Sequence, residues 1–162
     1  MATEYQASVE QVHAALRDEK YWLARLADSG ADETRLEAFD LGHDGGVDVV
    51  TTQVLHATRL PGVIHQFHHG DLEIRRAETW TAVSDGQAVA TVAGSIAGAP
   101  VSLIGEGALT PSESLSRLAF RATVEVSIPL VGGKLENFIS TQLERLLITE
   151  QKFTTAWIAE NH

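Results

Sequence analysis

The C-terminal end of the chain is one run without proline or glycine, residues 134–161. A run of this length that lacks both helix-breaking residues predicts a single long helix. Apolar residues recur through it at spacings of three and four for about seven turns, and Gln142 and Glu150 lie on or beside the apolar stripe. Such a stripe is long enough to lie across a whole sheet. We therefore expect the remaining residues to form the sheet on which this helix packs.

Residues 33–128 show the alternation of apolar and polar side chains that is typical of an antiparallel sheet. The alternation is clearest in the last segment, where Leu118 and Phe120 alternate with Arg117 and Arg121. The tripeptide Ser-Asp-Gly at 84–86 predicts a hairpin with a three-residue loop. Turn residues divide the region into six predicted strands: 33–41, 47–56, 72–83, 87–96, 101–109 and 115–128.

The N-terminal segment predicts a short edge strand at residues 2–7 and two short helices. Ser8 and Gln11 form a capping-box pattern at the start of the first helix, 8–16. The second helix, 19–27, has an apolar side that we expect to be buried. Its members are Tyr21, Trp22, Leu23 and Leu26.

The element order is therefore one strand, two short helices, six strands and a long helix, which is an α+β fold. A chain of 162 residues can form a stable core without covalent links, and we expect residues 1–162 to form a single domain. It contains no cysteine, which excludes disulfides, thiolate chemistry and cysteine-ligated zinc.

The charge balance argues against nucleic acid and anionic membrane surfaces as partners. The chain has 12 Lys plus Arg against 22 Asp plus Glu, a formal net charge of -10, so its surface repels nucleic acid and anionic membranes. The uncharged window 87–105 contains Pro100 and many small polar residues, which predicts strands and a turn and no stable membrane insertion. The N-terminus lacks the basic and apolar regions of a secretory signal, and a cytoplasmic location is expected.

Three segments resemble the START-like, polyketide cyclase and birch-allergen-related (SRPBCC) superfamily. They are the opening TEYQASVEQVHAALRDEKYW, the hairpin at SDG and the closing VEVSIPLVGGKLENFISTQLERLLITEQKFTTAW. The resemblance covers nearly the whole chain through its element order. It implies a helix-grip fold, a curved seven-stranded antiparallel sheet that wraps the C-terminal helix, with a cavity between them for a hydrophobic small molecule.

The strands are poor in large side chains, which favours a cavity, although small residues could also let the sheet bend around a filled core. Binding or transport of a lipid, acyl or polyketide-like molecule is the first functional hypothesis. The resemblance also allows a cyclase, dehydratase or hydrolase, and a protein-interaction module with a filled core is the third alternative. No catalytic residue can be named, no cofactor is expected, and the oligomeric state is open.

The strand at 72–80 carries two charged residues that could face this cavity. If Val83 pairs with Gln87, then Arg76, Glu78 and Trp80 point inward, where Arg76 and Glu78 could bind a ligand carboxylate or hydroxyl. A one-residue change of register would instead place this pair outside the sheet and turn Glu73 and Arg75 inward.

Residues of the long helix raise the same question. Gln142 and Glu150 either reach into the cavity or keep their tips in solvent, and Glu150 could act as an acid or base if burial raised its pKa. Phe138, Trp80 and Phe120 are core residues on the simplest interpretation, and they contact the ligand if core and cavity wall are one surface.

The segment HQFHHGD at 65–71 has histidines at i, i+3 and i+4, a spacing that can ligate zinc. The segment lies between turn residues, however, and nothing nearby completes a ligand set, so no metal is expected. We interpret it as a helix or loop at the cavity mouth, in which Phe67 contacts the ligand.

Overall fold

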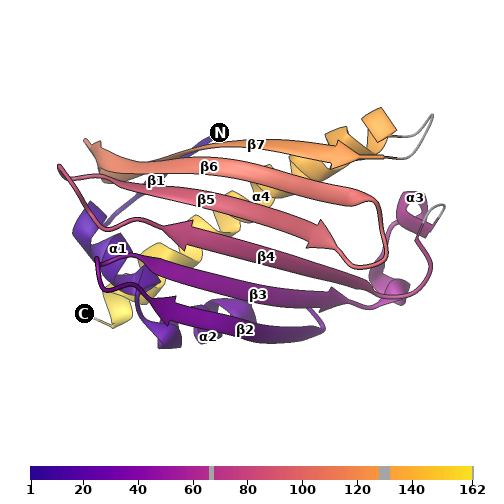
Figure 1. Ribbon diagram of the computed structural model, residues 1–162, viewed down its shortest axis with the longest axis horizontal. Coiled ribbons are helices and arrows are strands. Elements are labelled where there is room, and N and C mark those ends of the chain that lie inside the picture. Colours follow the sequence, from indigo (N-terminus) through magenta and orange to yellow (C-terminus); the bar gives the residue numbers. More distant parts are fainter. Residues whose placement is uncertain (66–67, 128–131, 162) are drawn as a thin grey trace.

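The computed structural model describes residues 1–65, 68–127 and 132–161. A curved seven-stranded antiparallel sheet has the long C-terminal helix against one face, and two short helices follow the first strand (Figure 1). The predicted α+β, helix-grip architecture is therefore confirmed.

Every pair of neighbouring strands in the sheet is antiparallel, in the order β1-β7-β6-β5-β4-β3-β2. Consecutive strands from β2 to β7 are neighbours, and only β1 is added from a distant part of the sequence. The strands are β1 (Ala2–Tyr5), β2 (Glu33–Leu41), β3 (Val47–Leu55), β4 (Leu72–Trp80), β5 (Ala88–Ile96), β6 (Val101–Ser112) and β7 (Leu115–Val126).

The β4–β5 hairpin has the register that turns Arg76 and Glu78 toward the long helix. Arg76 pairs with Gly94, and Glu78 pairs with Val92. The predicted three-residue loop is wrong, because Ser84 and Gln87 exchange two hydrogen bonds around a two-residue turn at 85–86. Positive φ at both turn residues, 53° and 76°, explains the Asp-Gly sequence. Beyond this turn the pairing of β4 with β5 shifts by one residue. The side chains of β4 therefore face the sides of the sheet that the sequence predicts.

The two N-terminal helices are α1 (Val9–Leu16) and α2 (Glu19–Asp28). Ser8 and Gln11 form the predicted capping box of α1. In α2, Tyr21 and Trp22 are buried as predicted, but Leu23 is 51% exposed. The buried face of α2 continues one turn after Tyr21 to Arg25, whose side chain is only 10% exposed. A charged residue thus occupies the interior where the sequence suggested a leucine.

The long helix α4 (Gly132–Glu160) packs on two separate apolar clusters. Near its C-terminal end, Ile158 joins the main core beneath α1, α2 and the centre of the sheet. Near its N-terminal end, Leu135 joins a smaller cluster with Ile64 and Leu72. The middle of α4 spans the space between these clusters. No helix in the described ranges is long and apolar enough to cross a membrane.

The connection from β3 to β4 contains two short helical turns, η1 (Ala57–Arg59) and α3 (Gly62–His65). They lie at the end of the sheet where β3 finishes and β4 begins (Figure 1). Ile64 and His68 are buried there. Ile64 attaches this connection to the apolar cluster near the N-terminal end of α4.

Candidate functional site

A cavity of about 680 Å³ lies between the concave face of the sheet and α4. Its wall is overwhelmingly apolar and is supplied by the inward positions of β4 to β7 and by the facing side of α4. Members of this wall include Ile74, Val92, Leu103, Phe120, Phe138 and Leu146. Gly94, in the middle of β5, lines the cavity and contributes no side chain to its wall.

Seven of the eight residues predicted from the sequence to contact a ligand line this cavity. They are Arg76, Glu78, Trp80, Phe120, Phe138, Gln142 and Glu150. The eighth, Phe67, lies outside the described residues. Their placement follows from the strand register and from the period of α4, and a ligand-binding role for each of them stays a prediction.

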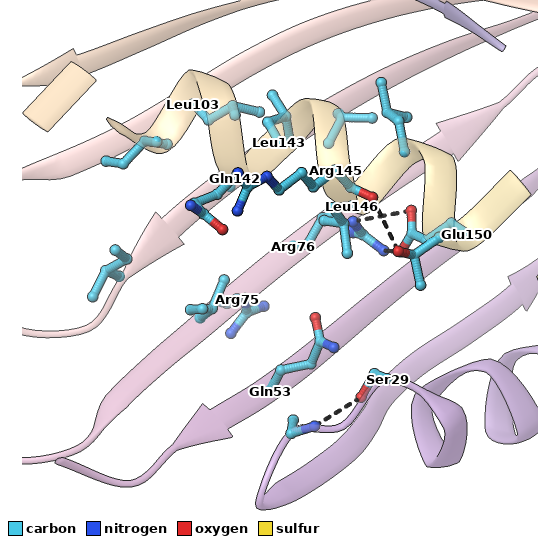
Figure 2. Close-up of a pocket in the computed structure, with 18 of the residues that line it drawn as sticks. Ser29, Gln53, Arg75, Arg76, Leu103, Gln142, Leu143, Arg145, Leu146 and Glu150 are labelled. Carbon is cyan, nitrogen blue, oxygen red and sulfur yellow. Dashed lines mark hydrogen bonds and ion pairs between the residues drawn. The ribbon is translucent and has the colours of Figure 1, made fainter. Parts of the chain in front are cut away.

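The exposed part of the lining lies between the end of α2, η1 and the middle of α4. Ser29, Arg59, Gln142 and Arg145 line the cavity and are exposed to solvent, which places its opening there. Figure 2 shows Gln142 and Arg145 on the helix and Ser29 across the opening from them. The entrance is thus polar, whereas the interior is apolar.

Four charged side chains form a cluster in the cavity wall. Arg25 from α2 and Arg76 from β4 both bind the carboxylate of Glu150 on α4. The closest distances to Glu150 Oε2 are 2.5 Å from Arg25 Nη2 and 2.6 Å from Arg76 Nη2. Glu78 completes the cluster from β4. Figure 2 shows Arg76 and Glu150 pointing toward each other. The cluster therefore links two helices to the sheet.

A chain of hydroxyl groups links Arg25 to the backbone of Glu150. Thr154 donates a hydrogen bond of 2.7 Å to the Glu150 carbonyl, and the Tyr21 hydroxyl donates one of 2.6 Å to Thr154 Oγ1. Arg25 Nη1 donates to the same Tyr21 hydroxyl at 3.4 Å, and its guanidinium lies 4.7 Å from the ring centroid of Trp22. The aromatic side chains of α2 thus fix the orientation of the arginine.

The paired arginines keep Glu150 ionised. Burial acts to raise the pKa of Glu150, but the charges and hydrogen bonds of Arg25 and Arg76 outweigh it and hold that pKa below its usual value of 4.5. Burial likewise acts against the charge of Arg25, and Glu150 raises the pKa of Arg25 well above its usual value. The sequence allowed Glu150 an acid–base role only if its pKa were raised, and that condition is not met.

The lowered pKa of Glu150 predicts a specific pH dependence of stability. Because the folded protein favours the ionised carboxylate, its stabilisation is complete above pH 4.5 and is lost as pH falls through the lowered pKa. We expect the difference in free energy of unfolding between the wild type and Glu150→Gln to shrink below pH 4.5, as measured by urea unfolding. An undiminished difference at about pH 3 would contradict this assignment.

Arg25 is the member of the cluster that the sequence did not reveal. It lies four residues after Tyr21 and three after Trp22, so helical spacing alone places it on the buried face. The apolar character of Leu23 instead predicts that residue on the buried face. The useful signal would have been the position of Arg25 on the helix, together with an acidic residue on the apolar stripe of α4.

The histidine segment forms no metal site among the described residues. No group of three histidine, aspartate or glutamate side chains is close enough there or elsewhere in the described ranges to bind one ion. His68 is buried, and its Nε2 is 2.9 Å from the Asp71 carbonyl oxygen. It lines the cavity with Leu60 and Ile64, so the segment contributes to the cavity wall.

Comparison with known proteins identifies the family. The family model described as "Protein of unknown function (DUF2505)" matches residues 1–158. The chain belongs to this family. It is 46% identical over 167 residues to "Uncharacterized protein Rv0481c" of Mycobacterium tuberculosis and to "Uncharacterized protein Mb0491c" of Mycobacterium bovis. Each alignment covers 99% of this chain and 96% of the relative.

Two solved structures share the fold at low sequence identity. The crystal structure of TTHA0849 from Thermus thermophilus has a TM-score of 0.59 and 14% identity, and the alignment covers 100% of this chain and 97% of that one. A conserved protein from Geobacillus kaustophilus has a TM-score of 0.56 and 16% identity, with coverage of 99% and 94%. At these identities the likeness extends to the fold alone.

Proposed function

We propose that the protein binds or carries a hydrophobic small molecule, such as a lipid, acyl chain or polyketide-like compound, in the cavity between the sheet and α4. The cavity itself is the observation that carries this proposal. Its volume of about 680 Å³ is within the usual range for small-molecule sites, and its wall is mainly apolar apart from the charged cluster and the polar entrance. The resemblance to the SRPBCC superfamily points in the same direction.

The cavity argues against the filled-core interaction module, because such a module needs no internal space of this size. The charged cluster argues against Glu150 as the acid or base of an enzyme. A carboxylate that binds two guanidinium groups and has a lowered pKa is a weak base and is not protonated near neutral pH. Binding of a small molecule is therefore the function that the site supports best.

Titration with the neutral apolar dye Nile red tests this proposal. A dye that enters one apolar cavity should bind saturably at one site per chain, with increased fluorescence, and a long-chain alcohol should displace it. Non-saturable fluorescence that no apolar competitor reduces would count against a binding cavity. Protein unfolded in urea serves as the control for nonspecific adsorption.

A further inference from the structure

Glu78 is a nearly buried carboxylate on the cavity wall that accepts no hydrogen bond from any described residue. Its side chain is 11% exposed, and its nearest cations are Arg76 Nε at 3.9 Å and Arg25 Nη2 at 4.0 Å. Both distances are too long for hydrogen bonds. A carboxylate removed from water needs donors to compensate for its lost hydration, so Glu78 has unused acceptor capacity next to the cavity.

The two arginines donate to Glu150 and not to Glu78, and Arg76 Nε, which lies nearest Glu78, is buried without a hydrogen-bond partner among the described residues. Arg76 donates to Glu150 through Nη2 at 2.6 Å, and Arg25 donates through Nε at 3.0 Å. Arg25 also donates to the Tyr21 hydroxyl at 3.4 Å, which supports its orientation. The arrangement of the cluster therefore leaves the Glu78 carboxylate free to accept a hydrogen bond from a ligand in the cavity.

The charges of the cluster determine which kind of hydrogen-bond donor a ligand can place next to Glu78. Two guanidinium groups and two carboxylates sum to zero, so the cluster as a whole attracts neither an anion nor a cation. A ligand carboxylate at Glu78 would face two like charges, and a ligand ammonium would face two guanidinium groups. A neutral hydrogen-bond donor meets neither repulsion.

We propose that Glu78 accepts a hydrogen bond from a hydroxyl group of the cavity ligand, which makes the ligand a neutral apolar molecule that carries a hydroxyl. This inference rests on the proposed function. The apolar body of the ligand occupies the cavity, and its hydroxyl lies at β4 beside the charged cluster. The exposed Arg145 at the opening offers the competing arrangement, an anionic head at the entrance.

Four decyl compounds that share one chain test the proposal by displacement of Nile red: 1-decanol, 1-methoxydecane, decanoate and decylamine. We expect 1-decanol to bind about tenfold tighter than 1-methoxydecane, which has an oxygen but no donor, and tighter than both charged compounds. Equal binding of the alcohol and the ether would overturn the hydroxyl assignment and leave the proposed function intact. Failure of Nile red and of all four compounds to bind would overturn both.

Substitution of Glu78 tests the residue itself. The amide oxygen of Glu78→Gln is a weaker acceptor than the carboxylate, so 1-decanol should lose part of its advantage over the ether. The variant cluster also has one excess positive charge, so decanoate should bind more tightly than to the wild type. Glu73→Gln is the matched control, because Glu73 is on the same strand, faces outward and is half exposed. An unchanged preference in Glu78→Gln would overturn the assignment.

The competing arrangement predicts a different pattern. Decanoate would then bind the wild type most tightly, and Arg145→Gln would remove that preference. This result would also overturn the hydroxyl assignment. The comparison of decyl compounds on the wild type needs no variant, so the test holds even if Glu78→Gln unfolds.

Discussion

Replacing Glu150 with glutamine is expected to lower the free energy of unfolding by about 3 kcal/mol, which we would measure by urea denaturation near neutral pH. The carboxylate is the common partner of Arg25 and Arg76, which come from different elements. Its loss leaves two nearly buried guanidinium groups with only the distant Glu78 for charge balance. Breaking a buried ion pair on one side costs this much because the remaining charge stays desolvated.

Glu144→Gln is the matched control for this prediction. Glu144 is on the exposed side of the same helix, and its substitution should change the free energy of unfolding by no more than about 0.5 kcal/mol. The double variant Glu150→Gln with Arg76→Met should lose less stability than the sum of the two single variants, because it removes one unbalanced charge. Equal small effects of Glu150→Gln and Glu144→Gln would show that the cluster does not stabilise the fold.

Substitution of Gly94 by tryptophan is expected to weaken Nile red binding at least about tenfold while the protein stays folded. Gly94 is at the centre of the inward face of β5, between Arg76 on β4 and Leu103 on β6. A Cβ atom there would meet Leu103 Cβ at 3.6 Å and the Arg75 carbonyl oxygen at 3.8 Å, both ordinary contacts. A side chain can therefore begin at this position without displacing the backbone, and we expect the indole to occupy cavity volume.

Ala93→Trp provides the control, because the adjacent residue faces outward and is exposed. It adds the same side chain to the same strand and should leave the dye affinity unchanged. Thermal unfolding of both variants checks that they fold, and Gly94→Trp should be as stable as the wild type, since glycine inside a strand is unfavourable. Unaltered dye binding by a folded Gly94→Trp would place the dye outside this cavity.

The fold was predictable because its main signals are periodic. The proline-free helix and the alternating strands specify which faces are buried, and these faces leave few alternatives for the topology. The errors were local. The turn at Asp85 and Gly86 has two residues, and the compensating shift that preserves the inward face of β4 depends on strand pairing, which local sequence does not record.

The site was predictable only in part. Register and helical period brought Arg76, Glu78 and Glu150 to one wall, as expected. Their mutual arrangement was not predictable, because it depends on Arg25, which is 125 residues from Glu150 in the sequence and is oriented by aromatic packing within α2. Tertiary contacts of this kind determine that Glu150 pairs with the arginines and that Glu78 keeps free acceptor positions.

Comparison of native and denaturing mass spectrometry tests the central claim, a binding cavity for an apolar molecule, most directly. Untagged protein should be purified gently and then incubated with a mixture of long-chain alcohols. We predict a native mass that exceeds the denatured mass by one discrete apolar compound per chain, either retained from the cells or taken from the mixture. Identical native and denatured masses after this incubation would contradict the account.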